Sequence, residues 1–465
     1  MKLILATLGS VPCLTMKAAV YKIWFLLLAL YVISAPFEGY IVVPGTGGHS
    51  IVSLLQRLIV LPLPLYVLYQ TLRQEPHTPW WYLVLLTAWL LWVGLTFAIF
   101  SPHTYYYVYY TWEQIAGYLL VLSLWTLSRH RTWAKATVLF TLFLYYGATL
   151  MVSFWEIRTA HHLGHSSEGG AHPKPIPTAF FYGPNHLGAA LALILPFIAF
   201  AASLVRTRWA YIISSLFTLA GLYVLYKTGS RGGELAIIIE FAALPFVLPR
   251  PYKRLALVAL AAVLVVFTSL MLYMQALPQT AHLPFALTKV RHIADLFAYH
   301  PHRVTAHQGP GSLAIRLALL HSGLQALSHH PWGLGPRGAE RYYLYYVHHK
   351  SPYNTYGVID AHNMWLEIAI DFGWLGLSLY VVFYAALLQG LYRLRHASDA
   401  FQRYVAWSGF IALTGFIIGS VSPSSVMIGF NIMWIVYGTA LIAIRQGTED
   451  GAINKKRHRQ DTAPF

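Results

Sequence analysis

The sequence has little charge and almost no cysteine, and both shortages restrict what the protein can be. Asp, Glu, Lys and Arg make up 10% of the 465 residues, while hydrophobic residues make up 57%. Soluble domains carry roughly 25% charged residues, so this composition predicts an integral membrane protein. The one cysteine, Cys13, excludes a disulfide framework within the chain and a metal site built from several thiolates.

Three further patterns are missing or carry little weight. Histidines occur in pairs at 161–162, 329–330 and 348–349, but no H-E-x-x-H pattern accompanies them, so we predict no metal site. The sequence has no internal repeat of the kind that is common in transporters. The net charge of +16 does not imply nucleic acid as a partner, because no soluble binding domain is available.

Long apolar runs dominate the rest of the sequence. A membrane-spanning helix needs about 20 mostly apolar residues, and the chain offers twelve such segments. The sequence therefore predicts an all-α integral membrane protein with about twelve transmembrane helices. The predicted helices are approximately 20–36, 52–72, 80–100, 112–128, 134–155, 185–204, 209–227, 233–248, 255–273, 363–391, 404–421 and 424–444.

Lysine and arginine gather in every second connection between these helices, as at Arg129, Arg206 and Arg250. Cytoplasmic connections are rich in these residues, so we expect both termini to be cytoplasmic. The chain then divides into helices one to nine (1–273), a long loop on the opposite side (274–362), helices ten to twelve (363–444) and a basic tail (445–465). We expect the tail to be disordered and to contact anionic lipid.

The 274–362 loop is the one sizeable soluble segment, so external chemistry is expected there. Gly and Pro at 308–311 and 331–336 mark turns. Between them, five leucines at helical spacing predict an amphipathic helix near the membrane surface. These leucines are Leu313, Leu317, Leu320, Leu324 and Leu327.

His362 and Asn363 stand at the start of the apolar run 363–391. Asp360 is suited to cap this helix, which would make His362 one of its first residues. The positive potential of a helix N-terminus would keep the imidazole neutral and able to accept a proton. It would also favour an anionic ligand. The ordinary alternative is a polar histidine at a membrane boundary.

Two arginines fall on the side of the membrane that should contain few. Arg231 follows KTGS (227–230) at the start of a predicted helix, and Arg316 lies on the amphipathic helix. Guanidinium groups bind phosphate oxygens in a bidentate manner and stay charged at any working pH. One arginine reaching toward lipid headgroups is ordinary, whereas two that converge would suit an anion.

The residues at 362–376 resemble a known signature. His362-Asn363, nine residues and then Gly373-Trp-Leu-Gly376 resemble the H-[NSQ]-x9-G-x-x-G pattern of bacterial O-antigen ligases. Within it, Gly373 and Gly376 are expected to permit close helix packing.

The two arginines extend the resemblance. SRG at 230–232 resembles the family's arginine at the outer start of a helix. Arg316, followed by HHPWGLGP (329–336), resembles its second arginine and the loop after it. Leu377 and His321 depart from the ligase pattern, which weakens the distinction between ligase and O-antigen polymerase.

The resemblance implies a GT-C-like enzyme of the bacterial inner membrane, with its active site on the periplasmic face and membrane lipid around it. It would transfer O-antigen from undecaprenyl diphosphate to a sugar hydroxyl of lipid A–core, with inversion and without metal or other cofactor. His362 would act as general base, and two guanidinium groups would stabilise the leaving diphosphate. The implied substrate-binding residues are Arg231, Arg316, Asn363, Asn185, His186 and Arg337.

Three alternatives stay open. O-antigen polymerase would use the same donor with a second lipid-linked glycan as acceptor. Another lipid-linked glycan ligase, such as a protein O-oligosaccharyltransferase, would differ only in its acceptor. Outside the enzymes, a transporter or flippase is the alternative, although transport does not need the long outer loop.

Overall fold

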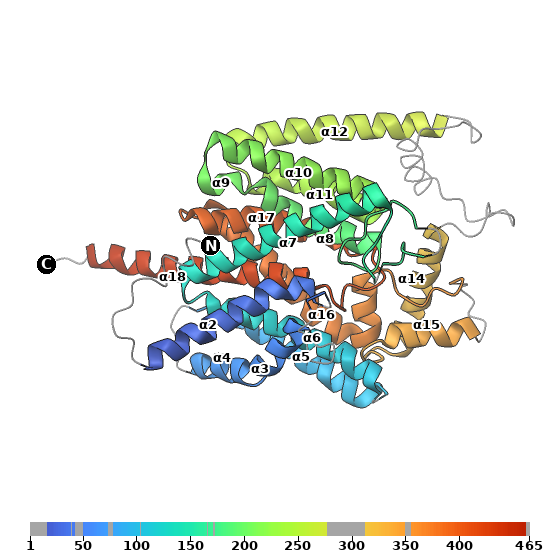
Figure 1. Ribbon diagram of the computed structural model, residues 1–465, viewed down its shortest axis with the longest axis horizontal. Helices are drawn as coiled ribbons and strands as arrows, with labels where there is room; N and C mark the ends of the chain where they lie inside the picture. The colour runs from blue at the N-terminus through green and yellow to red at the C-terminus, as the bar shows by residue number, and fades with distance from the viewer. Residues whose placement is uncertain are drawn as a thin grey trace.

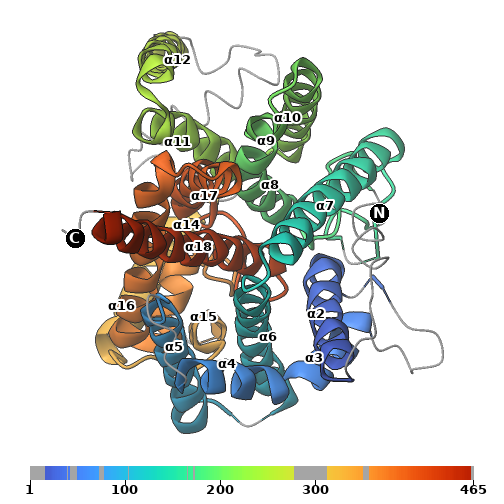
Figure 2. The same ribbon diagram turned by 90° about the vertical axis from the view of Figure 1, so that its left-hand side faces the viewer.

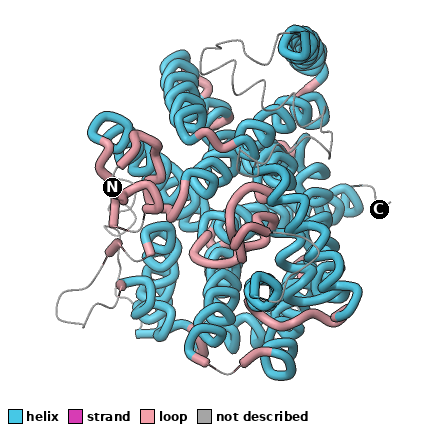
Figure 3. Tube along the Cα trace, turned by 90° about the vertical axis from the view of Figure 1, so that its right-hand side faces the viewer, coloured by secondary structure: helices cyan, strands magenta, loops and turns pink. Residues whose placement is uncertain are grey.

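The computed structural model describes residues 16–38, 40–41, 50–72, 78–102, 104–164, 166–170, 173–276, 312–348 and 355–461. Helices make up the regular elements of this part of the chain (Figures 1 and 3). They are α2 (Met16–Ser34), η1 (Ala35–Phe37), α3 (Ile51–Ile59), α4 (Pro62–Leu72), α5 (Trp81–Phe100), α6 (Tyr105–Leu127), α7 (Arg131–Thr159), α8 (Pro184–Ala199), α9 (Ala202–Val205), α10 (Arg208–Thr228), α11 (Arg231–Val247), α12 (Arg250–Ala276), α14 (Ser312–His329), α15 (Gly338–His348), α16 (Met364–Arg393), η2 (Leu394–His396), α17 (Ala400–Gly419) and α18 (Asn431–Asp461).

Within the described residues, six helical stretches are long and apolar enough to cross a membrane, which fits a multi-pass membrane protein. These stretches are Val20–Phe37, Trp81–Phe100, Arg131–Thr159, Pro184–Val205, Arg208–Thr228 and Met364–His396. A seventh is the bent pair α3 and α4, whose axes differ by 44°. All seven coincide with predicted spans. The other five predicted spans coincide with α6, α11, α12, α17 and α18, and their crossing of the membrane stays a prediction.

The helices form one bundle in which α18 lies centrally, against α6 and α17 (Figure 2). The long loop is described only in part: α14, α15 and 355–362 belong to it, and 277–311 lie outside the described residues. α14 covers the predicted amphipathic helix, but the predicted leucines are not uniformly buried. Leu327 is buried, Leu317 and Leu320 are half-buried, and Leu324 is exposed.

The predicted disorder of the tail was wrong for 445–461, because α18 continues as a helix to Asp461, and 462–465 lie outside the described residues. Side chains in the C-terminal half of α18 bind the junction between α6 and α7. The Arg445 guanidinium donates to the Trp125 carbonyl (3.2 Å), and Asp450 forms an ion pair with Arg131 (2.6 Å). These contacts stabilise the part of α18 that continues beyond its apolar residues.

α16 is broken at Gly373, which has φ 67° and ψ −172° within the helix. The loop 331–336 lies in this break, and a Cβ atom at Gly373 would lie 2.3 Å from the Pro331 carbonyl oxygen. The Trp92 indole donates to the carbonyl just before the break (2.7 Å). Gly373 therefore admits a loop rather than a neighbouring helix. Gly376 has the predicted packing role, since its Cβ would lie 3.1 Å from Trp92.

The predicted span 424–444 began too early, because α18 starts at Asn431. The residues between α17 and α18, SVSPSSVMIGF (420–430), are not helical and fold back into the bundle. Ser422 and Ser425 in this segment are buried or half-buried. This connection, hidden inside an apolar run, contributes directly to the candidate site.

Candidate active site

One cavity of about 230 Å³ collects side chains from four separate parts of the chain. α11 contributes Arg231, α14 contributes Arg316, and the residues at the start of α16 contribute His362 and Asn363. The remaining lining is mostly apolar: Gly232, Leu235, Leu317, Leu320, Ala361, Leu366, Ile418 and Val421. Drug-sized ligands usually occupy roughly 300–1,000 Å³, so this space suits a headgroup rather than a whole lipid-linked glycan.

The turn between α10 and α11 positions Arg231. Gly229 ends α10 with φ 66°, a left-handed conformation that glycine adopts without steric cost. Ser230 then caps α11, because its Oγ accepts from the Gly233 N–H (3.3 Å). Arg231 is thus the first residue of α11. Gly232 follows it against Ser422, where a Cβ atom would lie 2.4 Å from the serine Cβ.

The start of α16 differs from the prediction. Asn363, not Asp360, is the N-cap, and its Oδ1 accepts from the N–H groups of Trp365 (3.1 Å) and Leu366 (3.3 Å). The Met364 N–H donates to the Ser420 carbonyl (3.1 Å). These three N–H groups at the helix start therefore have partners, so the helix start is not the anion site that the sequence suggested.

His362 precedes the helix instead of belonging to its first turn. Its φ is 49°, in the left-handed region that few non-glycine residues occupy. Such strain costs about 1–2 kcal/mol and is often found at functional sites. The turn directs the imidazole into the cavity, beside Arg316.

Arg231 and Arg316 place two like charges at one cavity. The pKa of Arg316 is lowered by burial and by the nearby charge of Arg231, although a guanidinium stays charged at any working pH. Among the described residues, neither arginine forms an ion pair with a carboxylate. Two adjacent half-buried cations without a carboxylate partner repel one another, and an anion bound between them would relieve that repulsion.

The electrostatic surroundings keep the His362 imidazole neutral. Burial lowers its pKa, and the Arg316 charge lowers it further, while the Ser422 carbonyl and Asp360 act in the opposite direction. The Nδ1 atom lies 3.4 Å from the Ser422 carbonyl oxygen. Since a carbonyl only accepts, Nδ1 carries the proton in that contact and Nε2 keeps its lone pair.

Ser422 is the site residue that sequence reasoning missed. Its carbonyl contacts His362, its Oγ accepts from Arg316 Nη2 (3.4 Å), and its Cβ packs on Gly232. It therefore touches the three parts of the chain that bring Arg231, Arg316 and His362 to the cavity. The segment SVSPSS (420–425) interrupts an apolar run with serines and a proline, and this interruption was the signal available.

Asn185 and His186 are not among the residues that line the cavity. They begin α8, where His186 is buried and its Nε2 lies 2.9 Å from the Ser425 carbonyl oxygen. The Ser425 Oγ donates to Glu367 Oε1 (2.7 Å), one turn into α16. His186 thus supports the same 420–425 segment that contacts His362.

Arg337 also lies away from the cavity lining. Its guanidinium forms ion pairs with Glu340 (2.6 Å) and Asp360 (3.7 Å) and rests 5.0 Å from the centre of the Tyr106 ring. Its backbone N–H donates to Asp371 (2.9 Å), just before the break in α16. Through these contacts Arg337 holds the loop 331–336 and α15 in place.

Comparison with known proteins adds two findings. The sequence pattern of the family described as O-antigen ligase matches residues 216–381. That range contains Arg231, Arg316 and His362, whereas Ser422 lies beyond it.

One curated relative is the teichuronic acid biosynthesis protein TuaE of Bacillus subtilis (strain 168), which is 26% identical over 332 residues. The alignment covers 70% of this chain and 63% of the relative, so the chain spans just under two thirds of that protein's length.

Proposed function

We propose, since the chain belongs to the O-antigen ligase superfamily, that it transfers a glycan from a membrane-held lipid diphosphate to a sugar hydroxyl. The observation that supports this most directly is the meeting of Arg231, Arg316 and His362 at one cavity. Arg231 and Arg316, which have no carboxylate partner among the described residues, are suited to bind a diphosphate. A neutral imidazole beside them suits the removal of a hydroxyl proton.

The reaction is a displacement at the first carbon of the donor sugar. The acceptor oxygen forms a new bond to that carbon while the bond to the diphosphate oxygen breaks, and His362 Nε2 takes the acceptor proton. Attack opposite the leaving group inverts the configuration. The leaving diphosphate gains negative charge, which Arg231 and Arg316 stabilise. Because fixed guanidinium groups supply the positive charge, this mechanism needs no metal ion.

The finer assignment is O-antigen ligase, with undecaprenyl diphosphate as donor lipid and lipid A–core as acceptor. The active site would face the periplasm from the bacterial inner membrane. Polymerase is the second candidate, and one finding favours it: the curated relative TuaE is named for teichuronic acid biosynthesis rather than for lipopolysaccharide. The proposed catalytic groups serve either acceptor.

The deciding experiment incubates purified protein with a lipid-linked glycan and lipid A–core. Glycan on lipid A identifies a ligase, and longer lipid-linked chains identify a polymerase. Neither product, with well-folded protein and both substrates present, contradicts the proposed function.

The same assay tests the catalytic residues. His362→Ala removes the base and is expected to lower the rate by about 10²–10⁴. His362→Asn should do the same, and asparagine tolerates the left-handed backbone better than alanine. Arg231→Ala should lower the rate by about 10²–10³. Exposed residues outside the cavity provide matched controls: Arg158→Ala on α7 and His329→Ala on α14 should transfer glycan like wild type.

A further inference from the structure

Glu367 on α16 is a buried carboxyl that the proposed mechanism does not use, and 4% of its surface is exposed. Its Oε1 atom accepts hydrogen bonds from two hydroxyl groups, those of Tyr110 on α6 (2.8 Å) and of Ser425 (2.7 Å). Its Oε2 atom has no hydrogen-bond partner among the described residues. Burying a carboxyl is costly, so the two bonds at Oε1 indicate what this side chain does.

The bond from Ser425 connects Glu367 to the segment 420–425. The carbonyl oxygen of Ser425 lies 2.9 Å from His186 Nε2 at the start of α8. Ser425 is therefore held from two sides, through its hydroxyl by α16 and through its carbonyl by α8. Because the segment is not helical, side-chain contacts of this kind hold its backbone in place.

Ser422, in the same segment, contacts the proposed active site. Its carbonyl oxygen lies 3.4 Å from His362 Nδ1, and its Oγ accepts from Arg316 Nη2 (3.4 Å). Ser422 is three residues from Ser425, so the chain between them spans at most about 11 Å. A shift of Ser425 would therefore move the carbonyl that contacts the imidazole.

We propose that Glu367 is a positioning residue, which holds Ser425 so that the Ser422 carbonyl orients the His362 imidazole. In that orientation Nδ1 carries the proton and Nε2 is free to accept one. A misplacement of about 1 Å at a reacting group can lower a rate about 10²-fold. The expected effect on glycan transfer rests on the proposed function, whereas the expected effect on the imidazole does not.

The test compares two variants that each remove one hydroxyl from Glu367 Oε1. Ser425→Ala releases the segment 420–425, so kcat for glycan transfer should fall about tenfold to a hundredfold. KM for the donor should change little, because both arginines remain. Tyr110→Phe removes the other hydroxyl, and among the described residues Tyr110 makes no hydrogen bond to 420–425. This matched control should transfer glycan within about threefold of wild type.

Variants of Glu367 itself separate its bond to Ser425 from the other contacts of the serine. The Met427 N–H also donates to Ser425 Oγ (3.2 Å), and Glu367→Ala leaves that bond in place. Glu367→Ala should lower kcat as much as Ser425→Ala, and combining the two should cost nothing further. Glu367→Gln keeps an oxygen that can accept from both hydroxyls and should transfer glycan within about threefold of wild type. Losses that multiply in the double variant would contradict the proposal. If Glu367→Ala is not monodisperse in detergent, the comparison of Ser425→Ala with Tyr110→Phe decides alone.

A second readout follows the His362 imidazole directly and does not need glycan transfer. Diethyl pyrocarbonate modifies the unprotonated imidazole, so peptide mass spectrometry of labelling against pH gives the midpoint at which His362 loses its proton. The contact with the Ser422 carbonyl acts to raise the pKa of His362, because this hydrogen bond favours the protonated ring. Ser425→Ala and Glu367→Ala should therefore move the midpoint to lower pH. The other charged and titratable groups near the ring are unchanged in both variants: Arg231, Arg316, Asp360 and His186.

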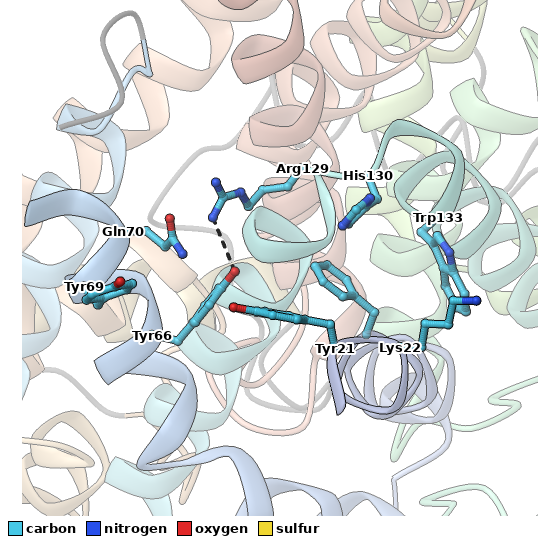
Figure 4. Close-up of a pocket in the computed structure, with 9 residues that line it drawn as sticks. Tyr21, Lys22, Tyr66, Tyr69, Gln70, Arg129, His130 and Trp133 are labelled. Carbon is cyan, nitrogen blue, oxygen red and sulfur yellow. Dashed lines mark hydrogen bonds between the residues drawn. The ribbon is translucent and has the colours of Figure 1, made fainter. Parts of the chain in front are cut away.

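His130 provides an internal control in the same samples. It lines a separate cavity of about 730 Å³ at the other end of the bundle from α14 and α15 (Figures 1 and 4), and its labelling should be the same in every variant. The inference is overturned if Ser425→Ala has the wild-type kcat or the wild-type His362 midpoint, or if Tyr110→Phe changes both as much. If wild-type protein transfers no glycan to either acceptor, the proposed function fails, and the His362 midpoint alone decides the role of Glu367.

Discussion

Replacing Gly373 by alanine tests whether the break in α16 organises the end of the bundle that holds the proposed active site. The residue has φ 67° and ψ −172°, a region occupied essentially by glycine alone, and forcing another residue there costs about 1–3 kcal/mol. The new Cβ would also lie 2.3 Å from the Pro331 oxygen and from the Trp332 carbonyl carbon. Both are backbone atoms that cannot rotate away.

Overpacking of this kind typically costs about 1–3 kcal/mol. The two effects together predict a loss of about 2–6 kcal/mol for Gly373→Ala, a large part of a typical stability of roughly 5–15 kcal/mol. Glycan transfer should fall as well, because the loop 331–336 holds one end of the first half of α16, and His362 directly precedes the other end.

The measurement is thermal unfolding of purified protein in detergent, read beside the transfer rate. Gly94→Ala on α5 is the matched control, since a Cβ there meets nothing within 4 Å and alanine favours a helix by up to about 1 kcal/mol. If Gly373→Ala unfolds at the same temperature as the control and transfers glycan normally, the account of the break is wrong.

Four further predictions concern the catalytic cavity. The lowered pKa of His362 keeps the imidazole neutral to a lower pH than usual, so kcat/KM should fall only below about pH 6.5; an acid limb centred above pH 7 would contradict the base assignment. Arg316→Lys should lower transfer about tenfold, since a point charge replaces a bidentate fork; a wild-type rate would make Arg316 structural. Ser422→Ala removes a weak bond to Arg316 but keeps the carbonyl that contacts His362, so the rate should fall about three- to tenfold with the acid limb unmoved; a shifted limb would show that the side chain acts on the imidazole. EDTA should leave transfer unchanged, and inhibition reversed by a divalent ion would refute the metal-free mechanism.

The sequence predicted much of the fold because membrane-spanning helices can be recognised from the length and hydropathy of their apolar segments. Seven predicted spans coincide with helices apolar enough to cross, and the arginines at 231 and 316 with His362 could be grouped because their helices start on one predicted side. Such reasoning uses local composition and sidedness only. It therefore predicted that Arg231, Arg316 and His362 lie at the same end of the bundle, but not the contacts that hold them there.

The predictions that were wrong depended on contacts between parts of the chain that are distant in sequence. Asp360 and Asn363 are both good N-caps, and the bond from the Met364 N–H to the Ser420 carbonyl is one contact that sets where α16 begins. The hydropathy pattern predicted a helix from residue 424 onward because the polar residues in 424–430 are small. The role of Arg337 in binding stays a prediction; its guanidinium pairs with Glu340, three residues on, and with Asp360, which only the fold brings near it.

These differences change how the proposed catalytic cavity would bind an anion. With the first N–H groups of α16 already bonded to Asn363 and Ser420, the helix start offers little to a diphosphate. In the proposed mechanism the positive charge comes from Arg231 and Arg316, and the Arg316 charge also lowers the pKa of His362. When a diphosphate neutralises that charge, the imidazole should become a stronger base. Donor binding would thereby prepare His362 to accept the proton of the second substrate, which favours an order in which the donor binds first.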